Sequence, residues 1–315
     1  MSILSSLQDP ILPIFMVMLV GYFMRRINFF DVPSAQGLNK FVFYMAMPAL
    51  IFELIRKIPL HLLDWPTVNA YLLSEFLVYG GVALITYRVF KRSLAEAILI
   101  GMAAGFVNHM MFVLPIARSL YGVQASEPIA AIVFVDIIVF CLTILLMDFI
   151  RAFESNKAGA FSLQKVVLML SKNPMVIASV LGLVAGALKN NIPSGVYTYT
   201  NFLGGAAAPA ALFALGVILG NQPLRPVSGP AWLAIGSKLI VHPALFFAMT
   251  LMGGAFIMKP DWQTMAYLVA AGPCGAMPFV IALQYNVKSD SIAKAVLIST
   301  VLSIISLSVL TGTLN

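Results

Sequence analysis

Residues Gly101–Gly122, GMAAGFVNHMMFVLPIARSLYG, form a stretch apolar enough to lie in a membrane, yet Asn108 and His109 stand near its middle. Pro115 follows further along the same stretch. A proline lacks an amide donor and displaces a carbonyl, whereas a spanning helix must satisfy its backbone groups internally. The stretch therefore predicts a helix that is interrupted where the freed groups face a cavity or other protein.

A second interrupted stretch occurs late in the chain. Residues Val269–Asn286 read VAAGPCGAMPFVIALQYN and contain Pro273 and Pro278. Two apolar segments that are interrupted by proline and glycine, in corresponding halves of a chain, are the best sequence indication of a secondary transporter's binding site. The pair predicts a protein of that class.

The composition indicates that lipid is the solvent of this chain. Of the 315 residues, 61% are hydrophobic and 10% are charged, whereas soluble domains have roughly 45–50% and about 25%. At about 20 residues per span, roughly ten helices fit. The net charge of +7 does not indicate nucleic-acid binding, because the basic residues lie at the ends of apolar stretches. Cys141 and Cys274 lie inside apolar stretches, so we expect neither a disulfide framework nor a metal site.

We expect an all-α membrane protein with ten spans. The predicted spans are residues 8–26, 38–55, 67–89, 94–120, 128–150, 174–189, 198–220, 230–252, 264–285 and 290–313. The longest break is 151–173, where residues 161–170 have the pattern of a short amphipathic helix lying along the membrane surface. These boundaries divide the chain into a first five-helix repeat (1–150), a cytoplasmic linker with an interfacial helix (151–173) and a second five-helix repeat (174–315).

The basic residues predict the orientation. With the N-terminus outside, 13 of the 19 Lys and Arg residues fall on the inner side and 5 on the outer side, with Lys238 inside a span. Cytoplasmic loops of membrane proteins carry an excess of Lys and Arg. We therefore expect both termini outside.

Internal similarity supports the two halves. Five of nine positions match between Ala46–Leu54 and Ala207–Leu215, and Ser74-Glu75 aligns with Ser237-Lys238. The interrupted stretches align through Ala103–Gly105 and Ala270–Gly272. Because each half holds an odd number of spans, the second copy must insert upside down, as an inverted repeat with broken fourth and ninth helices. Pro48 and Pro209, within the first of these matches, favour close helix packing.

If both broken helices cross near the middle of the membrane, their ends converge on one point. Helix N-termini expose unpaired N–H groups and partial positive charge, which favour an anion. The amide of Asn108 would add both donors and an acceptor. The alternative is that Pro115, Pro273 and Pro278 only kink packed helices.

Lys238 is the most informative charge. An ammonium group at the centre of a spanning helix costs on the order of 3 kcal/mol, so it needs a partner or water. The candidate partners are Glu75 and Asp136, in a pair that opens when an anion or a proton binds; a static pair is the alternative. His109 and His242 either titrate near neutral pH or bond a backbone carbonyl. Glu53, beside Arg56 and Lys57, is expected to form an interfacial ion pair.

These motifs resemble those of the auxin efflux carrier family, which includes the plant PIN-FORMED carriers and bacterial malate and malonate permeases. The similarity lies in Asn108, Pro115 and Tyr121-Gly122, and more specifically in Pro273, Pro278-Phe-Val, Ala282 and Tyr285-Asn286-Val287. It covers the whole chain. The long cytoplasmic loop of some plant members is absent, as in the bacterial members.

The resemblance implies two discontinuous helices that cross at proline, with Pro115 and Pro278 in those positions, and a substrate contact at Asn108. It also implies elevator-like alternating access and a scaffold that can dimerise. Two differences bear on the substrate: Gly275 stands where no asparagine accompanies the crossing, and His109 with a pair of methionines follows Asn108.

We therefore expect a secondary transporter of a small organic anion, such as malonate or malate, in the plasma membrane, the inner membrane if the cell is bacterial. The expected binding residues are Asn108, His109, Pro115, Pro273, Gly275 and Pro278, and the expected coupling charges are Asp136, Glu75 and Lys238. Coupling would use H+, carried by Asp136, Glu75 or His109, or Na+ at unwound carbonyls. We expect lipid and a second copy of the chain as partners, and no cofactor, nucleic acid or catalytic residue.

Two rival interpretations stay open. The first is an intramembrane enzyme built around His109, Asp136 and His242, although no nucleophile–base or metal spacing is present. The second is a ligand sensor that keeps a transporter fold without net flux.

Overall fold

The computed structural model describes residues 16–57, 63–154, 168, 171–188, 191–221, 226–252 and 257–314. These residues are almost entirely helical, and the β-structure among them is one isolated antiparallel bridge between Val107 and Cys274. Six helices within the described ranges are long and apolar enough to cross a membrane, namely Val32–Ile55, Trp65–Arg88, Glu127–Phe153, Ser194–Gly220, Gly229–Leu251 and Asp290–Leu307.

In the first half of the chain, Val32–Ile55 and Trp65–Arg88 are continuous helices. An interrupted helix follows them, and the long helix Ser126–Glu154 comes last. Residues 16–26 are helical. The elements that follow are α2 (Val32–Phe41), η1 (Val42–Ala46), α3 (Met47–Ile55), α4 (Trp65–Arg88), α5 (Leu94–Gly105), η3 (His109–Val113), α6 (Leu114–Tyr121), η4 (Val123–Ala125) and α7 (Ser126–Glu154). Asp31 caps α2, and the hydroxyl and amide of Ser34 that donate to it hold the pKa of this exposed carboxyl below its ordinary value.

The second half has a similar succession of elements. They are α9 (Pro174–Ala187), α10 (Ser194–Gly205), α11 (Ala207–Gly220), α12 (Gly229–Gly236), η6 (Ser237–Val241), α13 (His242–Leu251), α14 (Pro260–Ala270), α15 (Met277–Gln284) and α16 (Asp290–Leu314). Polar side chains start several of these helices: Asn173 accepts from the amide of Met175, and Ser228 from the amide of Ala231. Such caps satisfy amides that have no partner within the helix.

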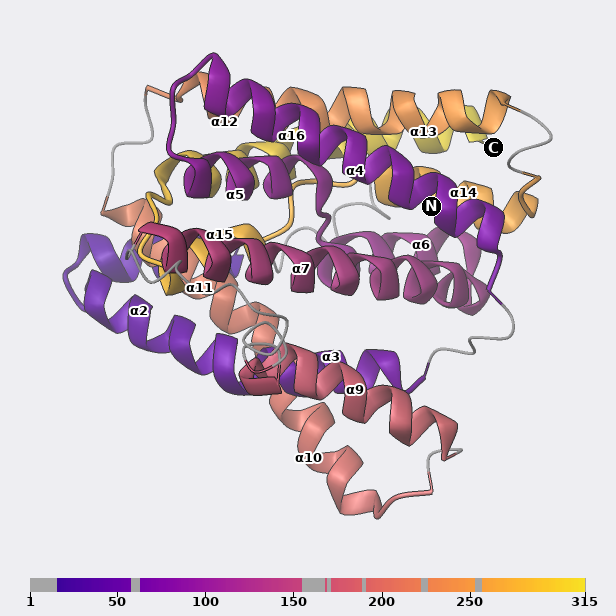
Figure 1. Cartoon of the computed structure of the whole chain (residues 1–315), viewed down its shortest axis with the longest axis horizontal. Helices are drawn as coiled ribbons and strands as arrows, with labels where there is room; N and C mark the ends of the chain where they lie inside the picture. The colour runs from indigo at the N-terminus through magenta and orange to yellow at the C-terminus, as the bar shows by residue number, and fades with distance from the viewer. Residues whose placement is uncertain are drawn as a thin grey trace.

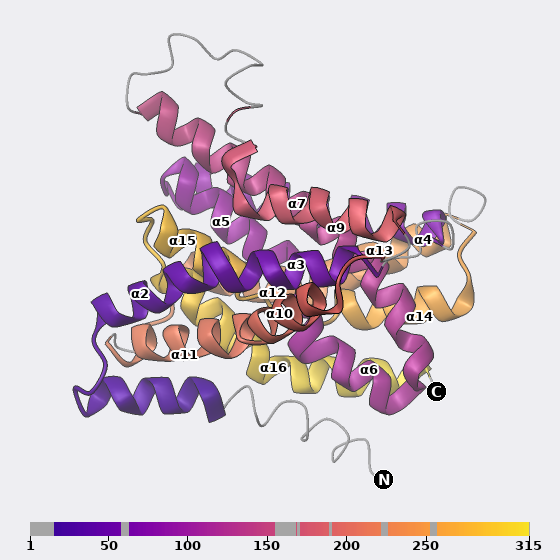
Figure 2. The ribbon, with the colours of Figure 1, turned by 90° about the horizontal axis from the view of Figure 1, so that it is seen from below.

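The helices form two groups that lie side by side (Figures 1 and 2). In the first, which we call the α3 group, α3 packs on α9 and α10, and α11 packs on α2. In the second, the α5 group, α4 packs on α5 and α13, α12 packs on α5 and α16, α15 packs on α5, and α14 packs on α7. The α3 group lies below the α5 group in Figure 1. The two groups are in contact where α3 meets α7, α11 meets α16 and α2 meets α15.

Glycines allow the closest packing inside the α3 group. A Cβ on Gly21 would collide with the carbonyl oxygen of Phe213, and one on Gly216 would collide with the carbonyl oxygen of Met18. The helix at residues 16–26 therefore lies backbone to backbone against α11. Close approach at small residues is how helices associate where lipid removes the hydrophobic driving force.

Three short π-helical turns share one cause. η1, η3 and η6 each end two residues before a proline, at Pro48, Pro115 and Pro243 respectively. A proline cannot donate to the carbonyl four residues earlier and collides with it, and a wider turn moves that carbonyl away. Pro48 and Pro115 therefore lie within helices that continue through them.

Several predictions fall partly outside the described residues. The first predicted span, 8–26, is described from residue 16 onward, and the predicted interfacial helix at 161–170 lies outside the described residues except for position 168. Two further apolar helices, Leu94–Gly105 and Pro174–Ala187, are shorter than a full span. The count of ten spans, the inverted repeat and the division at 151–173 stay predictions.

Candidate functional site

The chain leaves the helical conformation at two places that lie against each other. α5 ends at Gly105 and the next helical turn begins at His109, while α14 ends at Ala270 and α15 begins at Met277. Val107 and Cys274 form an antiparallel bridge, and the amide of Gly275 donates to the carbonyl of Phe106 at 2.8 Å. The two interrupted helices therefore cross at Val107 and Cys274.

The crossing satisfies the backbone groups that the interruptions expose. Besides the Gly275–Phe106 bond, the amide of Cys274 donates to the hydroxyl of Ser299 on α16 at 3.0 Å. Cys274 and Ser299 are both fully buried. Non-helical backbone is tolerated at membrane depth only where protein or a cavity surrounds it, and the crossing meets this condition.

Gly275 has a steric reason to be glycine. A Cβ at this position would lie 2.5 Å from Cδ1 of Phe106 and 3.1 Å from the carbonyl carbon and oxygen of Val107. Real Cβ atoms do not approach that closely, so any larger residue would force the two strands of the crossing apart. An asparagine, whose absence here is noted in the sequence, would therefore not fit at position 275.

The crossing does not lie at the prolines that the resemblance placed there. Pro278 occupies the first turn of α15, which begins after the second interruption, whereas Pro115 lies inside the continuous helix that η3 and α6 form. Proline is well tolerated at the position of Pro278, because an amide in a first turn has no partner within the helix. The expected crossing at Pro115 and Pro278 is corrected to Val107 and Cys274, and Pro273 lies within the second interruption, next to the bridge.

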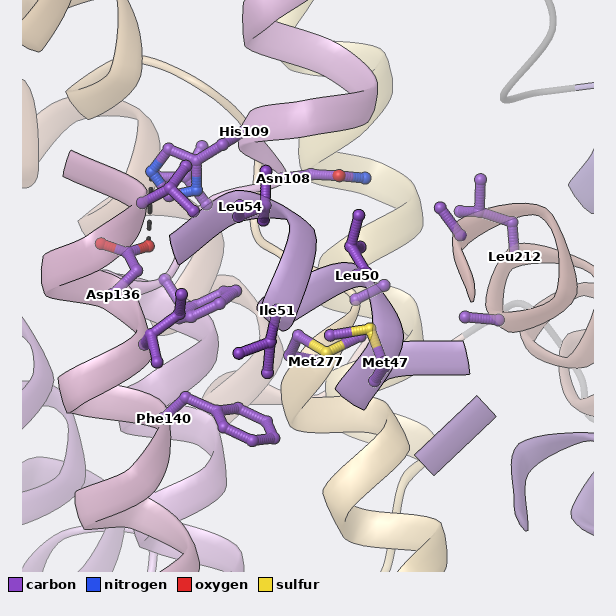
Figure 3. Close-up of a pocket in the computed structure, with 17 residues that line it drawn as sticks. Met47, Leu50, Ile51, Leu54, Asn108, His109, Asp136, Phe140, Leu212 and Met277 are labelled. Carbon is purple, nitrogen blue, oxygen red and sulfur yellow. Dashed lines mark ion pairs between the residues drawn. The ribbon is translucent and has the colours of Figure 1, made fainter. Parts of the chain in front are cut away.

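A cavity with a volume of about 100 Å³ opens beside the crossing, where the two helix groups meet (Figure 3). Each group supplies part of its wall. The α3 group contributes residues of α3 and α11. The α5 group contributes residues of α7, and residues in or next to the two helix interruptions. The lining residues are Met47, Leu50, Ile51, Leu54, Phe106, Val107, Asn108, His109, Val133, Asp136, Ile137, Phe140, Ala208, Ala211, Leu212, Ala276 and Met277. At roughly 10–15 Å³ per water, the volume suits several waters or one small solute.

Three polar residues face this largely apolar cavity. Asn108 is the residue before η3 and makes no side-chain capping bond, and its side chain points away from His109 in Figure 3. On the other side, His109 Nε2 lies 3.3 Å from Asp136 Oδ2 on α7. Asn108 therefore presents an amide at the N-terminus of a helix, where partial positive charge favours anions.

A buried cluster of ionisable groups lies behind Asp136. Glu75 on α4, Lys238 on η6 and His242 on α13 are fully buried, and Asp136 is 1% exposed. Glu75 and Asp136 lie near enough for their charges to interact, and among the described residues none of their four carboxylate oxygens has a hydrogen-bond partner. Two buried carboxylates close together repel each other when both are ionised.

Lys238 has a different partner from those expected. Its ammonium group lies 2.7 Å from Nδ1 of His242 and donates to the carbonyl oxygen of Ala270 at 3.1 Å. Among the described residues it forms no ion pair with Glu75 or Asp136, although it lies near enough to both to act on their charge. Because Ala270 ends α14, Lys238 places positive charge at the negative end of a broken helix.

The structure brings Asn108, His109 and Asp136 to one cavity, with Glu75 and Lys238 behind it. Pro273, Gly275 and Pro278 support the crossing and do not line the cavity. The expected Glu53 ion pairs are present, at 2.7 Å to Arg56 and 3.2 Å to Lys57, and Glu53 itself does not line the cavity although its neighbour Leu54 does.

The apolar wall that the α3 group supplies was not expected from the sequence. It consists of Met47, Leu50, Ile51 and Leu54 on α3, and Ala208, Ala211 and Leu212 on α11. A signal was present, because these residues fall within the matching stretches Ala46–Leu54 and Ala207–Leu215. In the sequence this match indicates an internal repeat and close helix packing, and nothing in it indicates a cavity wall.

An all-helical chain with several apolar spans and a cavity beside two crossing, broken helices defines a multi-pass membrane protein. The chain belongs to the family described as "Membrane transport protein", which matches residues 7–311. This confirms the resemblance to the auxin efflux carriers.

Named relatives of almost the same length extend this assignment. The chain is 28% identical to a protein of Rhizobium meliloti named "Putative malonate transporter", over 96% of this chain and 93% of that one. It is 26% identical to an uncharacterized transporter of Methanocaldococcus jannaschii, over 94% and 95% of the two chains. It is 21% identical to "Auxin efflux carrier component 8" of Arabidopsis thaliana, over 93% of each.

Proposed function

We propose that this protein is a secondary transporter of a small organic anion of the malonate or malate class. The observation that carries the proposal is the cavity between the two helix groups, with Asn108 at the N-terminus of η3 facing it. Membership of a transport family supports flux as the function, and the name of the Rhizobium meliloti relative supports the dicarboxylate class.

Anion binding would use the geometry of the first interruption. The amide of Asn108 can donate two hydrogen bonds to a carboxylate, and the amides of η3 add the positive end of a helix. The apolar side chains of Met47, Leu50 and Leu212 keep the site dry, which strengthens these interactions. The cavity volume of about 100 Å³ favours a substrate with few carbon atoms.

Alternating access would move the α5 group against the α3 group. The cavity is lined by both groups, so a displacement along their interface changes which side of the membrane it faces. Polar contacts across this interface are sparse in the described residues: the side chain of Asn39 donates to the carbonyl of Val280, and Gln284 donates to the hydroxyl of Tyr44. An interface held by apolar contacts can slide without breaking many buried bonds.

Coupling would use protons. Asp136 lies between the cavity and Glu75, and His109 contacts it from the cavity side, so a proton can pass from the cavity to the carboxyl pair. Lys238 already occupies the carbonyl of Ala270 at the end of α14, which disfavours sodium at that carbonyl. A buried cluster with two carboxyls and one lysine is neutral when the carboxyls share a single proton.

Uptake by purified protein in liposomes tests the proposal. Labelled malonate should accumulate when a pH gradient, acidic outside the vesicle, is imposed, and unlabelled malate should compete. Malonate should also stabilise the protein against heat, by about 2.7 kcal/mol at 100 times its dissociation constant. Stabilisation without uptake would instead indicate a ligand sensor, and formation of a product without uptake would indicate an enzyme.

A further inference from the structure

A second hollow, with a volume of about 290 Å³, lies near the end of α15. Unlike the central cavity it has a polar lining, which includes Tyr44, Asp148, Arg151, Lys172, Gln284 and Tyr285. The hydroxyl of Tyr285 donates to Asp148 at 2.7 Å, so the one acidic side chain of this lining already has a partner. Arg151 and Lys172 are both exposed and give the hollow a net positive charge.

The second hollow lies along the same three elements as the central cavity. On the η1–α3 helix the lining passes from Met47 to Phe43 and Tyr44, and on α7 from Phe140 to Asp148 and Arg151.

On α15 the lining passes from Met277 at the start of the helix to Gln284 at its end. At 1.5 Å per residue, the two hollows are separated by about 5 Å along the η1–α3 helix and by about 10–12 Å along α7 and α15. They therefore follow one another along the interface between the α3 and α5 groups.

We propose that the second hollow is a vestibule through which the transported organic anion passes between water and the central cavity, with Arg151 and Lys172 drawing it in. This inference rests on the proposed function. It assigns an entrance, which the location of the cavity alone does not provide.

Electrostatics gives Arg151 and Lys172 their role. A hollow with walls of low dielectric constant focuses the field of its charges and raises the local concentration of counter-ions. The effect weakens with salt, because charges are screened over about 10 Å at 0.1 M and about 3 Å at 1 M. Both residues also lie within the linker 151–173, which the sequence predicts to be cytoplasmic, so the vestibule would face the cytoplasm.

An apolar barrier separates the two hollows. Met47, Phe140 and Met277 are the lining residues of the central cavity that lie nearest, along their helices, to the lining of the second hollow. Figure 3 shows Met47 and Met277 next to each other, with Phe140 to one side. The Gln284–Tyr44 hydrogen bond, 2.6 Å long, joins the two helix groups at the vestibule itself. Passage of an anion then requires that these three side chains part and that this bond be released.

The test uses thiol reagents of opposite charge and does not require substrate flux. A cysteine is introduced at Leu50, a wall residue of the central cavity, in a chain in which Cys141 and Cys274 are replaced by alanine. The reaction rates of an anionic methanethiosulfonate (sulfonatoethyl) and of a cationic one (trimethylammonioethyl) are measured on purified protein at low ionic strength. The quantity of interest is the ratio of the anionic to the cationic rate.

We expect this ratio to fall at least about threefold when Arg151→Gln and Lys172→Gln are combined, and the fall to shrink at 1 M salt. Arg88→Gln is the matched control, because Arg88 is a basic residue exposed at the end of α4 that lines neither hollow. A second control cysteine at Gln124, exposed on η4 and lining neither hollow, should show no change of ratio.

An unchanged ratio at the Leu50 cysteine, or an equal change with Arg88→Gln, would overturn the vestibule. Such a result leaves the proposed function standing if labelled malonate still accumulates in liposomes. The converse result is a ratio of reaction rates that falls in the Arg151→Gln, Lys172→Gln variant while the unaltered protein takes up no malonate. That result would support the vestibule and exclude malonate as the transported substrate. The two proposals therefore fail separately.

Discussion

His109 Nε2 lies 3.3 Å from Asp136 Oδ2, and this contact joins the first interruption of the α5 group to the middle of α7. It is also the boundary between the cavity and the buried cluster, because Asp136 lines the cavity and its charge interacts with that of the buried Glu75. A change of charge at this contact is thus felt both by a solute in the cavity and by the buried carboxyl pair.

Asp136→Asn should abolish uptake driven by a pH gradient while malonate exchange down its own gradient persists. An asparagine keeps the shape of the side chain but cannot take up or release a proton, so a proton-coupled step loses its carrier. The measurement is labelled malonate uptake with and without an imposed gradient. Asp31→Asn, which alters an exposed cap at the start of α2, is the control and should behave as the unaltered protein. Undiminished pH-driven uptake in Asp136→Asn would remove this residue from the coupling.

Asn108→Ala should weaken malonate binding by about 10- to 100-fold. The expected loss corresponds to one hydrogen bond to a charged carboxylate, worth about 1.5–3 kcal/mol, and 1.4 kcal/mol corresponds to a factor of ten. Isothermal titration calorimetry in detergent measures the dissociation constant. Gln124→Ala, which removes an exposed amide on η4, provides the comparison and should leave binding intact. Equal affinities in all three proteins would place the anion elsewhere.

Lys238→Met should destabilise the protein by about 3–5 kcal/mol, because it leaves the buried carboxyls without their positive neighbour. The substitution also frees the carbonyl of Ala270 at the end of α14. Adding Glu75→Gln removes the excess negative charge, so the double variant should regain part of the loss. Thermal unfolding in detergent compares the single and double variants. A double variant that is less stable than Lys238→Met would show that Glu75 and Lys238 do not compensate one another.

Tyr44→Phe should increase the rate of malonate exchange about two- to tenfold, since it removes a hydrogen bond worth about 0.5–1.5 kcal/mol between the two helix groups. Gln284→Ala removes the same bond from the other side, so the two changes should not add when combined. Exchange rates in liposomes are compared with those of Tyr87→Phe, which alters an exposed tyrosine on α4. Additive effects of Tyr44→Phe and Gln284→Ala would mean that each acts through a different contact.

Sequence reasoning reached both interruptions and the polar residues of the cavity because lipid makes them conspicuous. Asn108, Asp136 and Lys238 stand out in apolar stretches, where an unpaired polar or charged group is costly. Each of them lies, in the structure, in the cavity or in the buried cluster behind it. The prolines in turn marked the two helices that are interrupted, since a proline is visible wherever helical hydrogen bonding must change.

Neither the crossing point of the two interrupted helices nor the partner of Lys238 could be predicted from polar residues and prolines in the sequence. Pro115 is accommodated by the π-helical turn η3, so the chain leaves the helix earlier, at Phe106, where the second interruption offers Gly275 as a donor. Lys238 pairs with His242 one turn along its own helix and with the end of α14. Both outcomes depend on backbone groups brought together by tertiary structure, which carry no signature in the sequence.

Gly275→Ala tests the crossing itself. The added methyl group would meet the ring of Phe106 at 2.5 Å and the backbone of Val107 at 3.1 Å, so the two interruptions must separate and lose the Gly275–Phe106 hydrogen bond. Overpacking of this kind costs about 1–3 kcal/mol, and the cavity next to it would change shape. We therefore expect a lower unfolding temperature together with weaker malonate binding. Gly236→Ala is the matched control, because a Cβ on that helical glycine meets nothing within 4 Å and alanine is the better helix former by about 1 kcal/mol. If Gly275→Ala were as stable as Gly236→Ala and bound malonate equally well, the close approach of Gly275 to Phe106 could not be what holds the cavity in shape.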